Sequence, residues 1–191
     1  MTIHIGPRRA LLKRRGLVNP ILSLSPAAYF QYGVGVTESG GFASAWADLS
    51  GNNRPLLQAV GTNQPAYAAG VLTFDGVDNF LKTAGFTLNQ PWSLAMLYRI
   101  VSYTAGDRIT DGNTNDSGML YMSGVSPNIQ MFAGTALLLA AGDPAVGDWA
   151  AGICVFNGAS SVISINGVSE STGAAGASNA GGFTLGASGG G

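Results

Sequence analysis

The sequence predicts an all-β protein, a sandwich of two antiparallel sheets preceded by an extended N-terminal arm. Glycine contributes 29 of the 191 residues and charged residues only 10%, a composition that disfavours long helices. Short apolar runs alternate with Gly, Asn, Asp and Ser at spacings of roughly 8–12 residues, as in sandwiches and jelly rolls. No stretch has a helical period long enough for an α/β fold.

The first 24 residues form the arm, which differs from the rest of the chain in charge. It holds five of the nine basic residues and no acidic one, whereas residues 16–191 carry four basic and ten acidic residues. Apolar side chains accompany the basic ones, so we expect an anchor that orders on a partner rather than a solvated leader. The expected partner-binding residues are Arg8, Arg9, Leu11, Leu12, Lys13, Arg14 and Arg15. Nucleic acid is disfavoured as that partner, because aromatic residues do not alternate with the basic ones.

Residues 25–191 form the predicted sandwich, and its first third sets the pattern. We expect a first strand at 25–32, a loop at 33–41, and then an antiparallel unit over 46–81. In that unit the segments WADLSGNNRPLLQ and VLTFDGVDNFL pair short apolar runs with tight Asp, Gly and Asn turns.

The clearest strand is expected at 92–101, where both faces carry apolar residues. Trp92 and Met96 share one face, and Ala95 and Leu97 share the other. Such a strand is usually central in a sheet that is covered on both sides. A polar loop is expected to follow at 104–118.

The last third predicts further short strands separated by turns. Asn166-Gly167 is a strong signal for a type I′ hairpin. A loop of small residues is expected at 171–182, before the final strand. The expected strands are residues 119–123, 128–133, 136–140, 148–157, 161–165 and 183–187, with a helical turn as the alternative at 136–140.

Several classes of function are disfavoured by the residues that the chain lacks. The single cysteine, Cys154, allows no internal disulfide or cysteine zinc site, and we expect it to be a small buried hydrophobe. The only histidine, His4, lies in the arm. The longest apolar run, residues 136–141, is far shorter than the roughly 20 residues of a transmembrane helix. We therefore expect no membrane insertion.

Catalytic patterns are equally weak. Gly186 to Gly190 matches G-x-S-x-G, but no helix follows to form the strained elbow of a hydrolase. Glycoside hydrolysis needs a pair of carboxylates, and the two glutamates, Glu38 and Glu170, fall in expected loops. The Asp75-Gly-Val-Asp78 segment is typical of a turn. We therefore expect that the protein is not an enzyme.

The ordered series of segments resembles the concanavalin A-like lectin/glucanase superfamily, and within it the laminin G-like domains. After the two segments quoted above come PWSLAMLYRI, DWAAGICVFNGASSVISINGV and GGFTLGAS, so that the resemblance covers residues 27–187. It implies a jelly roll of two antiparallel sheets. Members of that family continue with a closing strand, so we expect domain 25–191 to lack it. The strand beginning at Phe183 is then expected at an intersubunit contact or beside a further tail.

The resemblance also suggests two kinds of ligand. Laminin G-like domains often hold calcium, and a polar loop here offers the oxygen ligands Asp111, Asn113, Asn115 and Asp116, although such residues also form turns. No other cofactor is expected. A sugar would need an exposed aromatic ring beside polar groups, which Tyr103, Asp107 and Tyr121 could provide. We expect Trp92 and Trp149 in the core.

Together these features favour a non-enzymatic virion protein, either structural or adhesive. A basic, apolar arm, a low-charge sandwich and the lack of a disulfide or signal peptide are typical of a capsid-decoration or tail-fibre component of a bacteriophage. Its partners would be other virion proteins and itself, as a homo-oligomer. The alternative is an extracellular, lectin-like module that binds a cell-surface glycan, and a glycoside hydrolase is disfavoured.

Overall fold

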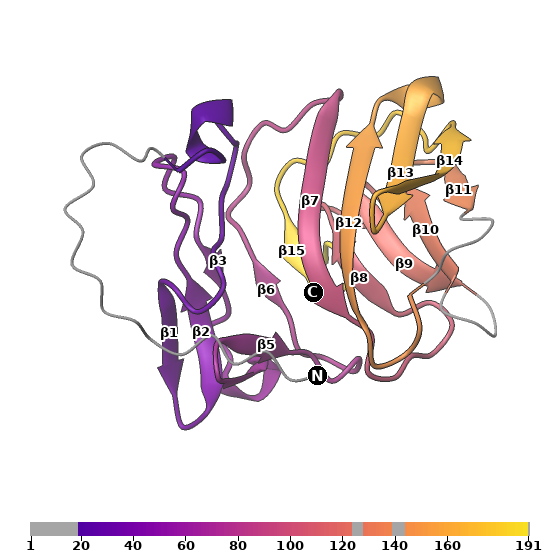
Figure 1. Cartoon of the computed structure of the whole chain (residues 1–191). Helices are drawn as coiled ribbons and strands as arrows, with labels where there is room; N and C mark the ends of the chain where they lie inside the picture. The colour runs from indigo at the N-terminus through magenta and orange to yellow at the C-terminus, as the bar shows by residue number, and fades with distance from the viewer. Residues whose placement is uncertain (1–18, 124–127, 139–143, 191) are drawn as a thin grey trace.

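A computed structural model describes residues 19–123, 128–138 and 144–190 of the chain. Its regular elements are strands and three-residue helical turns, which confirms the predicted all-β class (Figure 1). The turns in this described part are η1 (Leu22–Leu24), η2 (Gly61–Asn63) and η3 (Gly158–Ser160). No helix among the described residues is long and apolar enough to cross a membrane.

The larger sheet is antiparallel and runs β11-β10-β9-β8-β15-β6-β3-β2-β4-β5, with β1 paired beside β2. Most of its strands are short and are separated by turns rich in Gly, Asn, Asp and Ser. Its strands are β1 (Val36–Ser39), β2 (Phe42–Trp46), β3 (Leu56–Leu57), β4 (Ala66–Ala68), β5 (Val71–Thr73), β6 (Leu81–Lys82), β8 (Arg108–Asp111), β9 (Met119–Ser123), β10 (Asn128–Phe132), β11 (Ala136–Leu138) and β15 (Thr184–Leu185).

The smaller sheet is also antiparallel and runs β14-β13-β12-β7. Its strands are β7 (Trp92–Arg99), β12 (Trp149–Phe156), β13 (Ser161–Ile165) and β14 (Val168–Gly173). The β13–β14 hairpin turns at Asn166 and Gly167, whose φ angles are 53° and 83°. These two positive values are those of a type I′ turn, so the predicted hairpin is confirmed.

The hydrophobic core lies between the smaller sheet and strands β8–β10 of the larger one. Along β12 every second side chain is buried, and Phe156 stacks on Trp92 with ring centroids 4.2 Å apart. Leu120 and Met131 of the larger sheet belong to the same core cluster. Cys154 is fully buried in this cluster, which confirms its expected packing role, and burial raises the pKa of its thiol to about 12.

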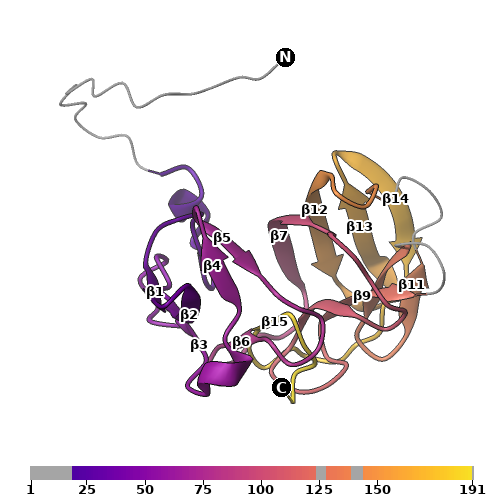
Figure 2. The ribbon, with the colours of Figure 1, turned by 90° about the horizontal axis from the view of Figure 1, so that it is seen from below.

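The two sheets differ in width, so one half of the larger sheet has no partner layer. Figure 2 shows the smaller sheet over β9 and β11, with β1–β5 standing to one side. On the covered side, β11 contacts β14 and the sandwich is closed. On the other side, β5 and β7 are the last strands of their sheets in the described structure.

Several predicted boundaries are wrong. Residues 25–32 pair in no ladder with the described strands and include a left-handed Ser25, and the expected loop at 33–41 contains β1. The expected polar loop at 104–118 contains β8, and the expected loop at 171–182 takes in the end of β14. In the three expected loops, pairing with a neighbouring strand overrides a polar or small-residue composition, because strand propensity depends strongly on context.

Two expectations about strand position are also wrong. The strand beginning near Phe183, β15, pairs with β6 on one side and β8 on the other, so it has no open edge. Strand β7, expected in the centre of a doubly covered sheet, is an edge strand. Its outer apolar face is not covered, and Leu97 is 65% exposed.

Replacing Phe156 with Ala should lower the free energy of unfolding by about 3–5 kcal/mol, because it empties a fully buried ring site. The matched control is Ile153→Ala, on the outer face of the same strand, which should cost less than about 1 kcal/mol. Urea denaturation of both variants measures the difference. Equal losses would show that the outer face of β12 is buried as deeply as the inner one.

Candidate functional site

An open groove of about 1360 Å³ separates the two uncovered edges of the sandwich. We call it the β5–β7 groove. One wall is β5 with residues 26–32, and the other is β7 with the outer face of β12. Its lining is mostly apolar and aromatic, and includes Tyr29, Phe30, Trp46, Leu72, Phe74, Leu97, Trp149 and Ile153.

The β7 wall presents both a strand edge and an apolar face. β7 pairs with β12 through eight residue pairs in unbroken register, and no ladder forms on its other side in the described structure. Alternate N–H and C=O groups of β7 therefore point toward the groove. On the outer face, Ile153 is 53% and Trp149 46% exposed. The Arg99 guanidinium lies 5.3 Å from the centre of the Trp149 ring.

In the opposite wall, residues 26–32 and their neighbours are held by individual hydrogen bonds instead of a ladder. Tyr29 N donates to Asp48 Oδ1 at 2.9 Å, and Leu49 N donates to Tyr29 O at 2.8 Å. Trp46 Nε1 donates to Val34 O at 3.0 Å. Residues 26–32 thus form a fixed aromatic wall although they belong to no strand.

Asp48 is the central acceptor of this wall. Its carboxylate also accepts the Ser50 N–H at 2.8 Å and the Arg54 N–H at 3.0 Å. Partial burial is the largest single effect and raises the pKa of Asp48, but the bonds from Tyr29, Ser50 and Arg54 together lower it below its usual value. The carboxylate is therefore kept ionised as an anchor for the backbone.

The acidic residues at the groove rim are also turn formers. Asp75 Oδ1 accepts the N–H groups of Val77, Asp78 and Asn79, and these bonds, with Val77 first, lower its pKa. Asp107 Oδ2 accepts the Thr104 N–H at 2.6 Å. A glycosidase acid needs a raised pKa, so the direction at Asp75 is opposite to that requirement.

The predicted sugar residues are divided by the structure. Tyr103 and Asp107 both line the groove, whereas Tyr121 is not among its lining residues. Tyr121 lies on β9 opposite Arg108, and its hydroxyl donates to Gln130 Oε1. Burial and then the charge of Asp116 raise the pKa of Tyr121.

Trp92 and Trp149 were both expected in the core, and the structure confirms this for one of them. Trp92 is buried, so the core placement is confirmed. The core placement of Trp149 is wrong, because this residue is half exposed on the groove wall.

The predicted calcium loop folds around the carboxylate of Asp111, which is fully buried. Oδ1 accepts the N–H groups of Gly112 at 2.7 Å and Ser117 at 3.1 Å. Oδ2 accepts those of Asp116 and Gly189, both at 3.0 Å. A carboxylate offers about four lone-pair sites, so these bonds use all of them.

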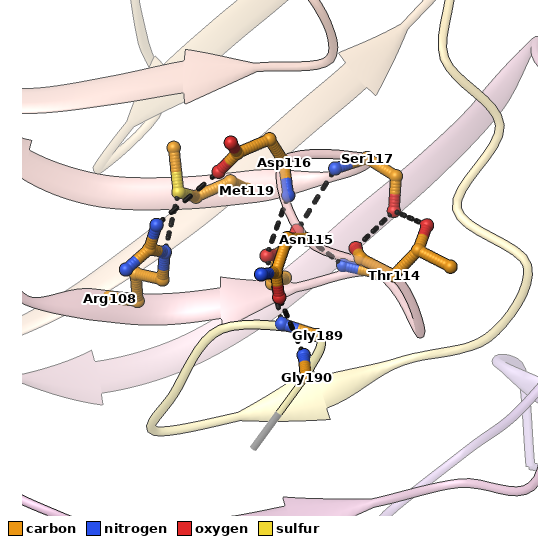
Figure 3. A network of polar contacts seen from close by, with 10 residues as sticks. Arg108, Thr114, Asn115, Asp116, Ser117, Met119, Gly189 and Gly190 are labelled. Carbon is orange, nitrogen blue, oxygen red and sulfur yellow. Dashed lines mark hydrogen bonds and ion pairs between the residues drawn. The ribbon is translucent and has the colours of Figure 1, made fainter.

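The other three expected ligands are engaged as well. Asn115 Oδ1 accepts the Gly190 N–H at 2.6 Å, and Asp116 pairs with Arg108 at 3.3 Å (Figure 3). Asn113, with its amide oriented to suit its neighbours, bonds to Thr83 O and Gly85 N at 3.2 Å each. These residues therefore do not fit a calcium site as they are arranged. In the parts of the chain described, no three acidic, His or Cys side chains cluster as metal ligands.

The loop instead fastens the C-terminal segment to the sheet. Besides the bonds to Asp111 and Asn115, Lys82 Nζ donates to Gly189 O. A Cβ at position 189 would lie only 2.3 Å from the Thr114 carbonyl carbon. Glycine is therefore required there, because the two backbones approach too closely for any side chain.

The predicted arm residues, Arg8, Arg9, Leu11, Leu12, Lys13, Arg14 and Arg15, lie outside the described residues, as does His4. Their role stays a prediction. Sequence reasoning missed the groove itself. Its available signal was the apolar outer face of residues 92–101 together with Trp149, which we assigned to a covered core.

Replacing Asp111 with Asn should lower the free energy of unfolding by about 3 kcal/mol. The NH2 group of Asn would take the place of one carboxylate oxygen and could not accept hydrogen bonds from the backbone N–H groups there. The matched control, Asp116→Asn, loses one half-exposed ion pair and should cost less than about 1 kcal/mol. Thermal unfolding compares the two. Millimolar calcium should leave the Tm unchanged, and a rise would contradict the structural role of Asp111.

The stability that Asp48 gives to the fold, by anchoring residues 26–32, should depend on pH. Because its folded pKa is lowered, the contribution of Asp48 is present above the unfolded value of about 3.9 and is lost as pH falls through the folded pKa. Asp48→Asn should cost roughly 2 kcal/mol at pH 7 and should reduce the drop in Tm between pH 5 and pH 3. The control is Asp78→Asn, at an exposed turn, which should retain the full drop. An unchanged drop in the Asp48 variant would contradict this assignment.

Comparison of the chain with models of known protein families, with curated proteins and with solved structures found no match. The two antiparallel sheets are shown by the structure, but nothing identifies a relative. The resemblance to the concanavalin A-like superfamily and the phage origin therefore stay predictions, and the function is argued from the geometry of the groove.

Proposed function

We propose that the protein is a non-enzymatic structural or adhesion component of a virion. The arm, residues 1–24, attaches it to the particle and the sandwich is displayed. The observation that carries the proposal is the β5–β7 groove, which is apolar and bordered by an open strand edge. Such an edge suits an extended protein chain, which gains backbone hydrogen bonds along it.

The polar groups around the groove support a binding role over a catalytic one. At the groove rim, Asp75 is held in its ionised form by backbone N–H groups and Asp107 closes a turn; Asp48, which anchors residues 26–32 without lining the groove, is held ionised in the same way. A carboxylate whose oxygens already accept backbone hydrogen bonds is poorly placed to exchange a proton with a substrate. The proposal needs no cofactor.

The charge division along the chain supports separate tasks for the two parts. The arm carries five basic residues, and residues 16–191 have a net charge of −6. An arm of opposite sign to the body is drawn toward acidic surfaces, including those of other copies or of other virion proteins.

A lectin-like role is the second candidate, and one observation favours it. Trp149 is half exposed on the groove wall beside Arg99, and Tyr103 and Asp107 line the same groove. An aromatic ring beside hydrogen-bonding groups is the usual platform for a sugar. On this alternative the protein is extracellular, and a glycan array should give hits that disappear in Trp149→Ala.

The particle role predicts that reversing the charge of the arm blocks assembly without unfolding the sandwich. In the full chain, changing Arg8, Arg9, Lys13, Arg14 and Arg15 to Glu should reduce the amount in purified particles roughly tenfold or more. The Tm should stay within about 2 °C, because these residues precede the packed domain. The control, Asp78→Asn, should be incorporated normally.

Two results would contradict the proposal. One is normal incorporation of the charge-reversed chain. The other is turnover of a polysaccharide that is lost when a single groove carboxylate, such as Asp107, is changed to Asn.

A further inference from the structure

We propose that the β5–β7 groove receives the N-terminal segment, residues 2–18, of a second copy of this chain, which adds a strand to the open edge of β7. The inference rests on the proposed function, since it names the partner that the groove and the arm would bind. It commits to a second copy, and the alternatives are outcomes of the test.

The first support is the character of the β7 edge. Natural proteins protect open edges with prolines, bulges, lysines or a covering segment. β7 has no proline or lysine within Trp92–Arg99, and its register with β12 shows no shift over eight pairs. Its outer face carries Leu97, which is largely exposed. An edge of this kind is expected to be covered in the working protein.

The second support is the length and sequence of the chain that precedes the described fold. Eighteen residues lie before Asn19, and fully extended they would span about 60 Å, against about 26 Å for the eight residues of β7. Thr2-Ile3-His4-Ile5 alternates polar and apolar residues, as a strand with one buried face requires. The segment is therefore long enough to follow β7, and residues 2–5 have the pattern of a strand with one buried face.

The third support is charge. The segment carries five basic residues, whereas the body that would receive it is acidic. Asp75 lies at the groove rim with its pKa lowered by backbone bonds, chiefly from Val77, and Asp107 lies nearby. A basic segment that passes these carboxylates is attracted, although exposed pairs add more to the association rate than to affinity.

The place where the chain enters the fold favours a second copy. Ile21 and Leu24 line the groove, so the N-terminal segment of each copy joins the described fold at the groove mouth. Leu24 is 79% and Tyr32 60% exposed there. When two copies face each other groove to groove, this apolar rim is covered and each arm starts beside the other's β7. Reciprocal exchange then closes as a two-fold dimer with both edges paired.

Disulfide trapping in full-length chains tests this directly. One variant carries Ile3→Cys, Ile5→Cys or Leu11→Cys, and a second variant carries Ala95→Cys, at an exposed site in the middle of β7. Cys154 gives no background because it is fully buried. The matched control replaces Ala95→Cys with Thr172→Cys, which is exposed on β14 away from the groove. The two variants are mixed, oxidised mildly and analysed by mass under non-reducing conditions.

The expected result is a linked pair of unlike chains with Ala95→Cys, at least fivefold above the yield with Thr172→Cys. A third variant carries both cysteines, one in the arm and Ala95→Cys, in the same chain. If it forms only a disulfide within that chain, the arm fills its own groove and the proposal is overturned. Equal yields at both positions would overturn it as well. Neither result bears on incorporation into particles, which tests the proposed function separately.

A second measurement avoids the engineered cysteines. Leu97→Arg places a charge on the groove face of β7, and Val60→Arg places one on an exposed apolar residue that does not line the groove. In sedimentation experiments the native chain and Val60→Arg should be dimeric at micromolar concentration, and Leu97→Arg should be monomeric but folded, with the circular dichroism spectrum of the native chain. A monomeric native chain at that concentration would contradict the exchange.

Discussion

The unequal widths of the two sheets are the constraint from which the other features follow. A buried core needs two apolar faces, and here the smaller sheet supplies only enough face to cover β8–β10. The remaining strands of the larger sheet must be held by other means. The uncovered half consequently depends on turns, on side-chain to backbone bonds and on residues 26–32, and it leaves a groove where the second layer ends.

Two carboxylates replace missing secondary structure in this fold. Asp48 gathers the N–H groups of Tyr29, Ser50 and Arg54, and Asp111 gathers those of four residues that include Gly189. Each joins segments that are far apart in sequence through residues that lie outside the ladders or at their ends. Backbone N–H groups in irregular segments need acceptors, and an ionised carboxylate with about four lone-pair sites can serve several at once. Polar residues in the turns are therefore part of the framework.

Local patterns predicted the regular parts of the fold well. The strands at 119–123 and 161–165 agree with β9 and β13, and Asn166-Gly167 makes its hairpin, because alternation and turn residues are properties of short segments. The position of β7 could not be predicted in the same way. Apolar residues on both faces suit either a covered strand or an edge that borders an apolar groove, and only the tertiary arrangement distinguishes the two. Trp149 was misplaced for the same reason. The oxygen-rich loop around Asp111 was located, but its acceptors are used by a segment that is 78 residues away in sequence.

The different surroundings of the three tryptophans have a spectroscopic consequence. Trp92 is stacked on Phe156 inside the core, Trp46 contacts Phe30 on one groove wall, and Trp149 is half exposed on the other wall. Emission from Trp149 responds to whatever enters the groove, whereas emission from Trp92 reports chiefly on its stacking against Phe156 in the core. Because each indole reports on a separate part of the fold, chains that retain a single tryptophan would distinguish occupation of the groove from loss of the core without an added label.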